Sequence, residues 1–470
     1  MIKEEKTQME LQKKLSPWQV WALAFGCIIG CGAFLLPGDS FLVKAGTLGT
    51  AIAFSLAALL MIIVALNYHY MINKYPVAGG EFTYAVNTFG RINGFICAWF
   101  LGLSYLTIVP LNATALSVIG RNLLGNIFQI GFHYNVAGYD IYFGEIMLAV
   151  AALALFAFLS IRGVKTTGIF QVILVTALIG GVFIVLMAAI CNPQISFDNL
   201  RPAFSMHGSK TAGVLAIIAV APFSFVGFDT IPQAAEEFNF SPKKAKWIMI
   251  FAIIFGAAIY VTITIITAVA VPEGYATWAE YIDNLGNLDG LLSLPTFHAA
   301  QQLLGKWGLL LMGLSVLGAI LSGIMGFYMA TSRLLYSLGK EKMLPDWFAQ
   351  LHRKYKTPKN AILFVMLVSF IAPFFGRTVL GWIVDMSSVG AAVGYGYTSL
   401  SAFRFAKKQG DRKIMVTGIL GTIIAIVIMV LLLVPIKGLD CSMDVESYIL
   451  LVVWSIVGIF FYRKNRKGRQ

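Results

Sequence analysis

Two apolar segments of this 470-residue chain are interrupted by glycine and proline, at matching places in its two halves. One covers residues 26–38 (GCIIGCGAFLLPG) and the other covers 221–232 (APFSFVGFDTIP). Inside a bilayer an unpaired backbone N–H or C=O group costs several kcal/mol, so a helix is broken there only where the freed groups face protein, water or a ligand. The two segments therefore predict a binding site made by two discontinuous helices, an arrangement typical of secondary transporters.

The backbone groups freed at these breaks indicate what the site binds. A half-helix that begins at Gly30–Gly32 presents free N–H groups and the positive end of the helix dipole, which suit a carboxylate. The carbonyls near Ala221 to Ser224, before the second break, suit an ammonium group. Together they complement a zwitterion and predict an amino acid substrate; close helix packing at the glycines is the alternative. The substrate-binding candidates are Ile29, Gly30, Cys31, Gly32, Ala221, Phe223, Ser224, Phe225 and Gly227.

Ionisable side chains inside apolar runs are candidates for coupling and gating, because burying a charge in a membrane is costly. Asp229 follows the second break, where it either exchanges a proton or caps the second half-helix. Glu236 and Glu237 lie at the end of the same run, beside a basic loop, and predict salt bridges of an inner gate. The secondary candidates are two carboxylates, Asp385 and Glu145, and four tyrosines for which packing is the alternative role, Tyr105, Tyr328, Tyr395 and Tyr397.

The elements that must position these residues are membrane helices. Hydrophobic residues make up 58% of the chain and charged residues only 12%, with a mean hydropathy of +0.79, too apolar for a soluble globule of this length. The sequence predicts an all-α polytopic protein with apolar runs long enough to span a bilayer. The twelve runs are 18–38, 48–71, 93–119, 142–161, 168–191, 212–235, 247–271, 306–332, 360–376, 379–402, 414–436 and 447–462.

The net charge of +13 follows the membrane topology. If both termini are cytoplasmic, 28 of the 35 Lys and Arg residues fall in segments on that side. This positive-inside bias accounts for the basic composition without a nucleic acid partner. We therefore expect a multi-pass protein of the plasma (inner) membrane with lipid as its solvent, as a monomer or homodimer.

Other chemistry finds little support in the sequence. The five cysteines form neither a disulfide framework nor a zinc site, so no metal or cofactor is expected. The five histidines lie at the ends of the apolar runs or in loops, which argues against a membrane enzyme. No G-x-x-x-x-G-K-[ST] loop supports ATP-driven pumping.

Two long loops have more than a connecting role. Residues 272–305 are acidic and apolar, and we expect short helices that form an extracellular lid, with a passive loop as the alternative. Residues 333–359 combine charges with aromatic residues and are expected to lie along the membrane surface.

Five motifs in register resemble the amino acid–polyamine–organocation (APC) superfamily: IGCGAF at 29–34, YPVAGGEFTY at 75–84, RGVKTTGIFQ at 162–171, FVGFDTIPQAAEE at 225–237 and SRLLYSLGKEKMLP at 332–345. The resemblance implies a leucine-transporter-like core of two inverted five-helix repeats, 18–191 and 212–402, and two extra helices in 414–462. Cytoplasmic segments 1–17 and 463–470 flank them. It also implies that Phe223 or Phe225 closes over the substrate, and Lys165 in the third motif is a gating candidate.

Two departures from the family pattern limit what it implies. Cys31 replaces a serine between the glycines, and Leu178 stands where some relatives carry a lysine used in coupling. Sodium is not favoured, because the run 306–332 offers only isolated Ser315 and Ser322 and no carboxylate; serine hydroxyls with carbonyls of the first run are the alternative that would still suffice. A proton is a candidate coupling ion. The expected function is amino acid permeation or exchange by alternating access. The alternatives are a polyamine or amino-alcohol transporter of this fold and a non-transporting amino acid sensor.

Overall fold

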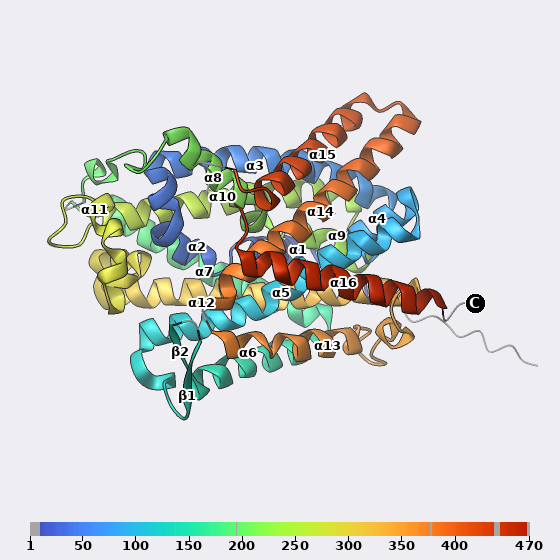
Figure 1. The fold of residues 1–470 in the computed structure, drawn as a ribbon, viewed down its shortest axis with the longest axis horizontal. Helices are drawn as coiled ribbons and strands as arrows, with labels where there is room; N and C mark the ends of the chain where they lie inside the picture. The colour runs from blue at the N-terminus through green and yellow to red at the C-terminus, as the bar shows by residue number, and fades with distance from the viewer. Residues whose placement is uncertain (1–9, 137, 194, 377, 437–441, 468–470) are drawn as a thin grey trace, which may run out of the picture.

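A computed structural model describes residues 10–136, 138–193, 195–376, 378–436 and 442–467, and most of these are helical (Figure 1). The longer elements are, in chain order, α1 (Pro17–Ile28), α2 (Gly32–Leu36), α3 (Leu42–Lys74), α4 (Gly80–Phe89), α5 (Arg91–Leu124), β1 (His133–Val136), β2 (Tyr139–Tyr142), α6 (Phe143–Ile161), α7 (Val164–Cys191), α8 (Lys210–Phe225), α9 (Thr230–Gln233), α10 (Ala245–Val269), α11 (Trp278–Asp283), α12 (Pro295–Lys340), α13 (Lys359–Ser369), α14 (Thr378–Gln409), α15 (Arg412–Leu433) and α16 (Val445–Lys467).

Eight helical stretches in the described part of the chain are long and apolar enough to cross a bilayer. They contain the predicted runs 48–71, 93–119, 168–191, 306–332 and 447–462, and all but one to three residues of the runs 142–161, 247–271 and 414–436. The other four runs lie on α1–α2, α8, α13 and α14. The chain is thus polytopic and all-α in its membrane part, as predicted. A total of twelve crossings and an inverted repeat stay predictions.

The two predicted interruptions are present as gaps between helices. Helix α1 ends at Ile28, and α2 begins at Gly32. Helix α8 ends at Phe225, and α9 begins at Thr230. Gly227 between them has φ of 148°. A Cβ there would lie 2.5 Å from the Ile28 nitrogen, so only glycine permits this approach. The two breaks therefore touch each other at the centre of the molecule.

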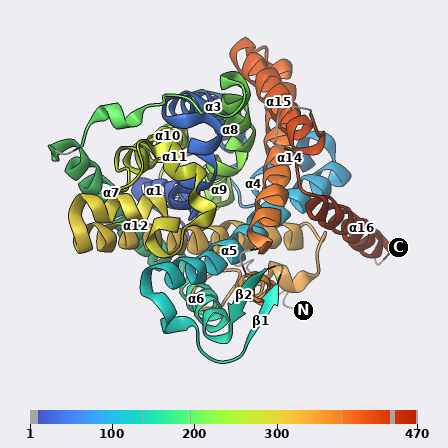
Figure 2. The ribbon, with the colours of Figure 1, turned by 60° about the vertical axis from the view of Figure 1, so that its left-hand side comes forward.

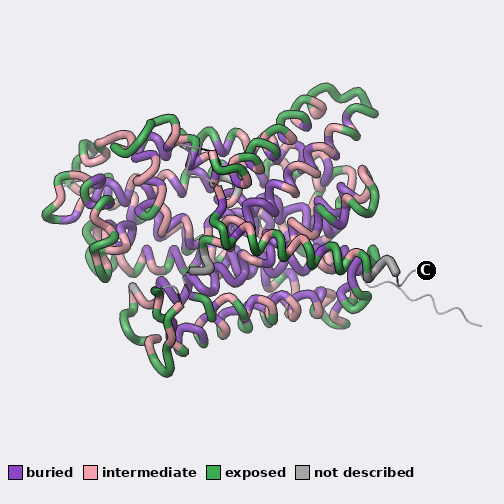
Figure 3. The backbone as a smooth tube through the Cα atoms, in the orientation of Figure 1, coloured by how far each residue is buried: buried purple, intermediate pink, exposed green. Residues whose placement is uncertain are grey.

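The core forms around these breaks, and the last two helices lie at its edge (Figures 1 and 2). Of the most apolar stretch of α5 and of α12, 67% is buried, against 28% for α15 and 11% for α16. Burial in Figure 3 is concentrated in the middle of the bundle, with exposed backbone along α15 and α16. Since exposed large hydrophobic side chains line α15 and α16, these faces suit contact with lipid rather than water.

Several loops differ from the sequence-based expectation. No loop separates the first two predicted runs: a π-helical turn, η1 (Pro37–Phe41), leads directly into α3, which bends at Gly46. In the predicted lid, Trp278 and Tyr281 of α11 are buried, and residues 295–304 form a helical segment that bends at Gly305 before the long part of α12. A short antiparallel hairpin, β1–β2, was not expected. Helix α12 also continues to Lys340, eight residues into the predicted surface loop 333–359.

Candidate functional site

The end of α1 is held by side chains from two other helices. The Tyr260 hydroxyl of α10 donates to the Ile28 carbonyl at 3.1 Å, and the Ser322 hydroxyl of α12 donates to the Gly26 carbonyl at 3.1 Å. Gln171 of α7 donates in turn to the Ser322 carbonyl at 3.1 Å. Helix-end carbonyls left free by the break are thus satisfied, which fixes the geometry of the first half-helix.

A small closed cavity lies beside the breaks. Its volume is about 20 Å³, enough for one or two water molecules and far too small for an amino acid. No charged side chain is among the residues that line it: Cys27, Ile28, Gly30, Cys31, Gly32, Ile108, Leu111, Asn112, Phe223, Val226 and Tyr260. The structure therefore represents a conformation in which the space between the breaks is closed.

Polar groups without partners face this cavity or lie next to it. Asn112 of α5 is 1% exposed and its Oδ1 atom accepts no hydrogen bond, while its Nδ2 atom donates to the Ile108 carbonyl of its own helix. A Cβ at Gly30 would lie 3.5 Å from that Oδ1, so the amide faces the first break. The Ser224 hydroxyl at the end of α8 is also buried and unpartnered. Buried polar groups rarely stay unsatisfied, so these two atoms mark a place for a ligand or for water.

The backbone at the first break is open to hydrogen bonding as well. In the described part of the chain, the N–H groups of Gly30, Cys31 and Gly32 donate to no backbone carbonyl. These three residues line the cavity, together with Phe223. This arrangement provides backbone donors at one wall, the Asn112 amide at another and mostly apolar surface elsewhere.

The remaining predicted binding residues divide between the cavity and the protein core. Phe223 lines the cavity, whereas Phe225 is completely buried and packs edge-on against Phe54, with 6.3 Å between ring centroids. Ile29 is completely buried beside the break. Ala221 lies in α8, but its side chain is outside what the structure describes.

Asp229 does not cap the second half-helix through a hydrogen bond, which removes that reading of its carboxylate. Its Oδ1 atom instead accepts the Gly227 N–H at 2.7 Å, and its Oδ2 atom accepts the Tyr105 hydroxyl at 3.0 Å. The reason is its backbone, since the αR conformation of Asp229 turns the side chain back toward the break. Tyr105 also lies 3.3 Å from Oε1 of Glu81, a completely buried residue of α4 that sequence reasoning did not single out.

The two predicted gating glutamates make different contacts. Glu237 forms a buried ion pair with Arg333 of α12, at 2.8 Å, with both side chains at most 2% exposed. Glu236 accepts the Ala78 N–H at 3.1 Å. The Glu237 carbonyl also accepts N–H groups of the N-terminal segment, from Lys14 at 2.9 Å. The end of the broken helix is thus tied to three parts of the chain.

Other candidates lie outside the cavity. Lys165 is exposed at the start of α7. Glu145 pairs with Arg121, and Asp385 accepts the Ser447 hydroxyl at 2.8 Å, so both carboxylates connect neighbouring elements. Tyr328 donates to the Leu153 carbonyl at 3.0 Å, a packing role.

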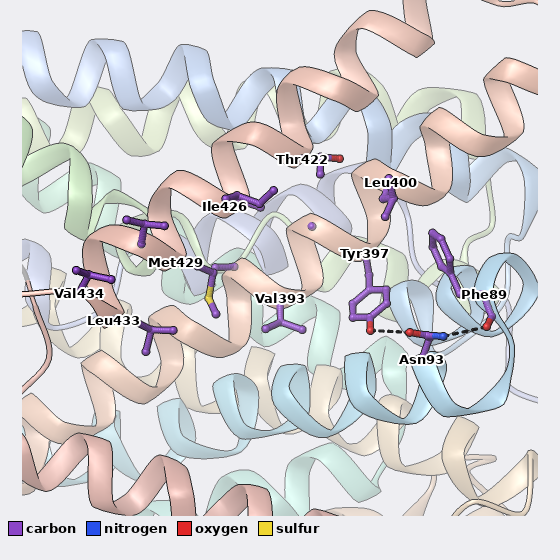
Figure 4. A pocket seen from close by; sticks show the side chains of 14 residues that line it. Phe89, Asn93, Val393, Tyr397, Leu400, Thr422, Ile426, Met429, Leu433 and Val434 are labelled. Atoms are coloured by element: carbon purple, nitrogen blue, oxygen red, sulfur yellow. Dashed lines mark hydrogen bonds between the residues drawn. The ribbon is translucent and has the colours of Figure 1, made fainter.

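Tyr397 belongs to a separate groove between α14 and α15, where it donates to Asn93 Oδ1 at 3.1 Å (Figure 4). Nearly all the side chains of that groove are apolar, and its volume is about 530 Å³. It suits lipid acyl chains better than a zwitterion.

Sequence reasoning missed Glu81, Asn112 and Gln233. Glu81 stands in a motif that had been identified, directly after the two glycines of YPVAGGEFTY, and a carboxylate beside a membrane run was a usable signal. Asn112 offered a weaker one, as an amide within a long apolar run two residues after Pro110. Nothing local to the sequence distinguished Gln233.

Comparison with known proteins agrees with this architecture. The profile of the family described as "Amino acid permease" matches residues 15–462. The chain is 26% identical over 415 residues to the branched-chain amino acid permease BcaP of Bacillus subtilis, covering 86% of this chain and 83% of that protein. It is 26% identical over 411 residues to a methylthioribose transporter of the same organism, covering 86% and 83%. It is also 25% identical over 413 residues to the amino-acid permease RocC of B. subtilis, covering 85% and 82%.

The family match covers nearly the whole chain and includes both helix breaks, the buried carboxylates and the outer helices. It places the protein among permeases rather than enzymes, as a multi-pass membrane protein involved in amino acid transport. The chain belongs to the amino acid permease family of the APC superfamily.

Proposed function

We propose that this permease moves a neutral amino acid across the cell membrane by alternating access, as a secondary transporter with its substrate site between the two breaks. The observation that carries the proposal is the closed cavity where the breaks meet, with N–H groups at Gly30–Gly32 that donate to no backbone carbonyl and no charged side chain in its lining. A substrate enters when the half-helices move apart and enlarge this space.

The zwitterion fits the polar groups at the two breaks. Its carboxylate accepts the free N–H groups of the first break. Its ammonium group donates to carbonyls at the end of α8 and to the unpartnered Oδ1 of Asn112. The side chain then faces Ile108, Leu111 and Val226. An aliphatic side chain is favoured there because apolar surface is buried on both sides of the contact.

A positively charged substrate has less support. Polyamines and basic amino acids require a carboxylate for the distal amine, and no carboxylate lines the cavity in the described chain. A substrate without a carboxylate remains the second candidate, since one relative is named a methylthioribose transporter and Cys31 offers the first break no hydroxyl.

The test is uptake by the full-length protein reconstituted in liposomes. The panel contains radiolabelled leucine, valine, arginine, putrescine, ethanolamine and methylthioribose, each measured with and without the same compound preloaded inside. We expect leucine or valine to be taken up and the amines to be excluded. Uptake of an amine or of methylthioribose, but of no amino acid, would overturn the assignment, and binding without flux would indicate a sensor.

The glycine at the contact between the breaks provides a structural control. Gly227→Ala places a Cβ 2.5 Å from the Ile28 nitrogen and 2.8 Å from the Cys27 carbonyl carbon, so we expect uptake to be lost. Gly180→Ala is the matched control, because a Cβ at that position of α7 meets no atom within 4 Å. Equal loss of uptake in both variants would mean that the breaks have no special role.

A further inference from the structure

Two buried carboxylates from distant parts of the chain share one hydroxyl group. Glu81 on α4 and Asp229 after the second break are both 0% exposed. The Tyr105 hydroxyl of α5 lies between them, 3.3 Å from Glu81 Oε1 and 3.0 Å from Asp229 Oδ2. Three helical elements thus meet at a single O–H group.

Counting hydrogens at the Tyr105 contact shows that its single hydroxyl hydrogen does not serve both carboxylates. Asp229 Oδ1 already accepts the Gly227 N–H at 2.7 Å, and Glu81 Oε2 accepts the Gln233 amide at 2.6 Å. Tyr105 has only one hydrogen and cannot donate to both carboxylates. A proton on Glu81 Oε1 completes the chain, because Glu81 then donates to Tyr105 and Tyr105 donates to Asp229.

Charge balance leads to the same conclusion. In the described part of the chain, none of the titratable side chains that face the two carboxylates carries a positive charge; they are Tyr68, Tyr84, Tyr105, Tyr395, Cys27 and Cys97. Arg333, the one buried cation among the described residues, is paired with Glu237 instead. Two ionised carboxylates at hydrogen-bonding distance from one hydroxyl, away from water and without a cation, would be strongly unfavourable.

Unpartnered groups point into the same site. The Tyr68 hydroxyl of α3 is completely buried beside Glu81 and makes no hydrogen bond of good geometry. A Cβ at Gly394 would lie 3.7 Å from that hydroxyl and 3.9 Å from Cγ of Glu81, so Tyr68 and Glu81 face the same small space. Oε1 of Gln233 is likewise buried and unpartnered. These atoms are available to an additional proton or to the water that delivers it.

We infer that Glu81 and Asp229 form the proton-binding site of this permease and share a single proton in the closed state, held on Glu81 and hydrogen-bonded through Tyr105. The inference rests on the proposed transport function and identifies its coupling ion. Binding forms one O–H bond on Glu81 and changes the charge of the pair from −2 to −1. Release of the proton restores −2 and makes the two carboxylates repel each other.

The position of the pair connects its charge to the closure of the protein. Glu81 belongs to α4, whereas Gln233 and Asp229 belong to the broken helix, which is tied to the start of α4 again by Glu236 and the Ala78 N–H. Repulsion between the carboxylates separates α4 from α9 and admits water between them. Proton release therefore favours opening on the side of the N-terminal segment, and proton binding favours the closed state.

The test compares proton-driven uptake with exchange in liposomes that contain a pH-sensitive dye. The substrate is the amino acid that the uptake panel identifies. In the wild type, we expect an inward proton gradient to accelerate uptake and substrate entry to acidify the interior. Glu81→Gln is a neutral analogue of the protonated side chain, so exchange should remain measurable while both proton effects are lost. Asp385→Asn removes a carboxylate elsewhere in the bundle and should keep both.

Infrared spectroscopy of the wild type tests the same inference without depending on a variant's activity. The spectrum at neutral pH should contain the carbonyl band of a buried protonated carboxylic acid, present in Asp385→Asn and absent in Glu81→Gln. Absence of the band in the wild type would overturn the shared proton. A band that survives in Glu81→Gln and disappears in Asp229→Asn would overturn its placement on Glu81.

The outcomes also separate this inference from the proposed function. Wild-type uptake that does not respond to a proton gradient would overturn proton coupling and leave amino acid transport intact. Absence of both uptake and exchange for every panel member would overturn the transport proposal itself.

Discussion

The helix breaks are closed on their two sides by different kinds of contact. On the side of the lid, aromatic rings stack and Pro295 packs onto Gly38; we call this the apolar closure, formed by Phe41, Phe54, Phe225, Tyr260, Gly38 and Pro295. On the side of the N-terminal segment, buried ionisable and amide groups are paired. We call this the polar closure, formed by Glu81, Tyr105, Asp229, Gln233, Glu237 and Arg333.

The difference shows which of the two closures can respond to a change in the charge of its side chains. Apolar contacts are non-directional, so a rearranged aromatic cluster still buries its surface. A buried charge that loses its partner is strongly destabilised, because its desolvation is no longer offset by an ion pair or a hydrogen bond. Conformations in which only part of the polar closure is broken are therefore unfavourable. The apolar closure is therefore suited to re-form around substrates of different shape, and the polar closure is suited to act as a switch.

The largest effect should follow from breaking the buried ion pair of the polar closure. Arg333→Met leaves Glu237 buried without a cation, and we expect a loss of about 3–5 kcal/mol in stability. The midpoint of thermal unfolding in detergent measures it. The double variant Glu237→Gln/Arg333→Met should recover most of the loss, and failure to recover would mean that Arg333 acts through packing rather than charge.

A smaller effect is expected at the cavity between the two closures. Asn112→Leu removes an unpartnered oxygen, and a lost hydrogen bond to a charged substrate group costs about 1.5–3 kcal/mol, or about 10- to 100-fold in affinity. Equilibrium binding of the transported amino acid measures this, with thermal stability nearly unchanged. Thr114→Val is the control, because Thr114 is also buried and unpartnered on α5 but does not line this cavity.

The apolar closure should tolerate substitution better. Phe54 stacks on Tyr260, with 4.6 Å between centroids, and contacts Phe41 edge-on at 5.1 Å. Phe54→Leu keeps an apolar side chain but leaves a small cavity, so we expect a stability loss of about 1–2 kcal/mol. A loss as large as that of Arg333→Met would contradict the distinction between the two closures.

The smallest effect is expected for a charge pair at the surface. Arg91 and Glu341 approach to 3.8 Å with about half of each side chain exposed. Glu341→Gln should change stability by about 0–1 kcal/mol, because solvent screens the pair. Comparison of its thermal unfolding with that of Arg333→Met then shows how much burial increases the loss of stability when an ion pair is broken. A comparable loss in both variants would indicate that burial is not the cause of the large effect at Arg333.

The sequence predicted the membrane fold and the places of both breaks, because glycine and proline inside apolar runs leave few alternatives. It also identified Asp229 as a buried carboxylate. It did not identify the partners, since Gln233 and Glu81 are 152 positions apart and Tyr105 and Asp229 are 124 apart. Contacts between such distant residues depend on how the helices pack, and hydrophobic periodicity does not contain that information.

The choice between Phe223 and Phe225 shows the same division at the scale of one helix. The two residues are two positions apart, which corresponds to a rotation of about 200° around a helix with 3.6 residues per turn. Their side chains therefore point to nearly opposite sides of the helix, and only one of them can face a given cavity. In an almost uniformly apolar run, the sequence does not fix the rotation of the helix. The fold places Phe223 at the cavity and Phe225 against Phe54.

By itself, the sequence determined that this protein spans a membrane and where two of its helices break, because these follow from the cost of unpaired polar groups in lipid and from the torsions of glycine. Only the tertiary structure decided that the breaks touch, that one tyrosine joins two carboxylates and that Glu237 meets Arg333. The physical reason is that burial and pairing of charge are properties of the packed helices, and each helix on its own carries only half of every such contact.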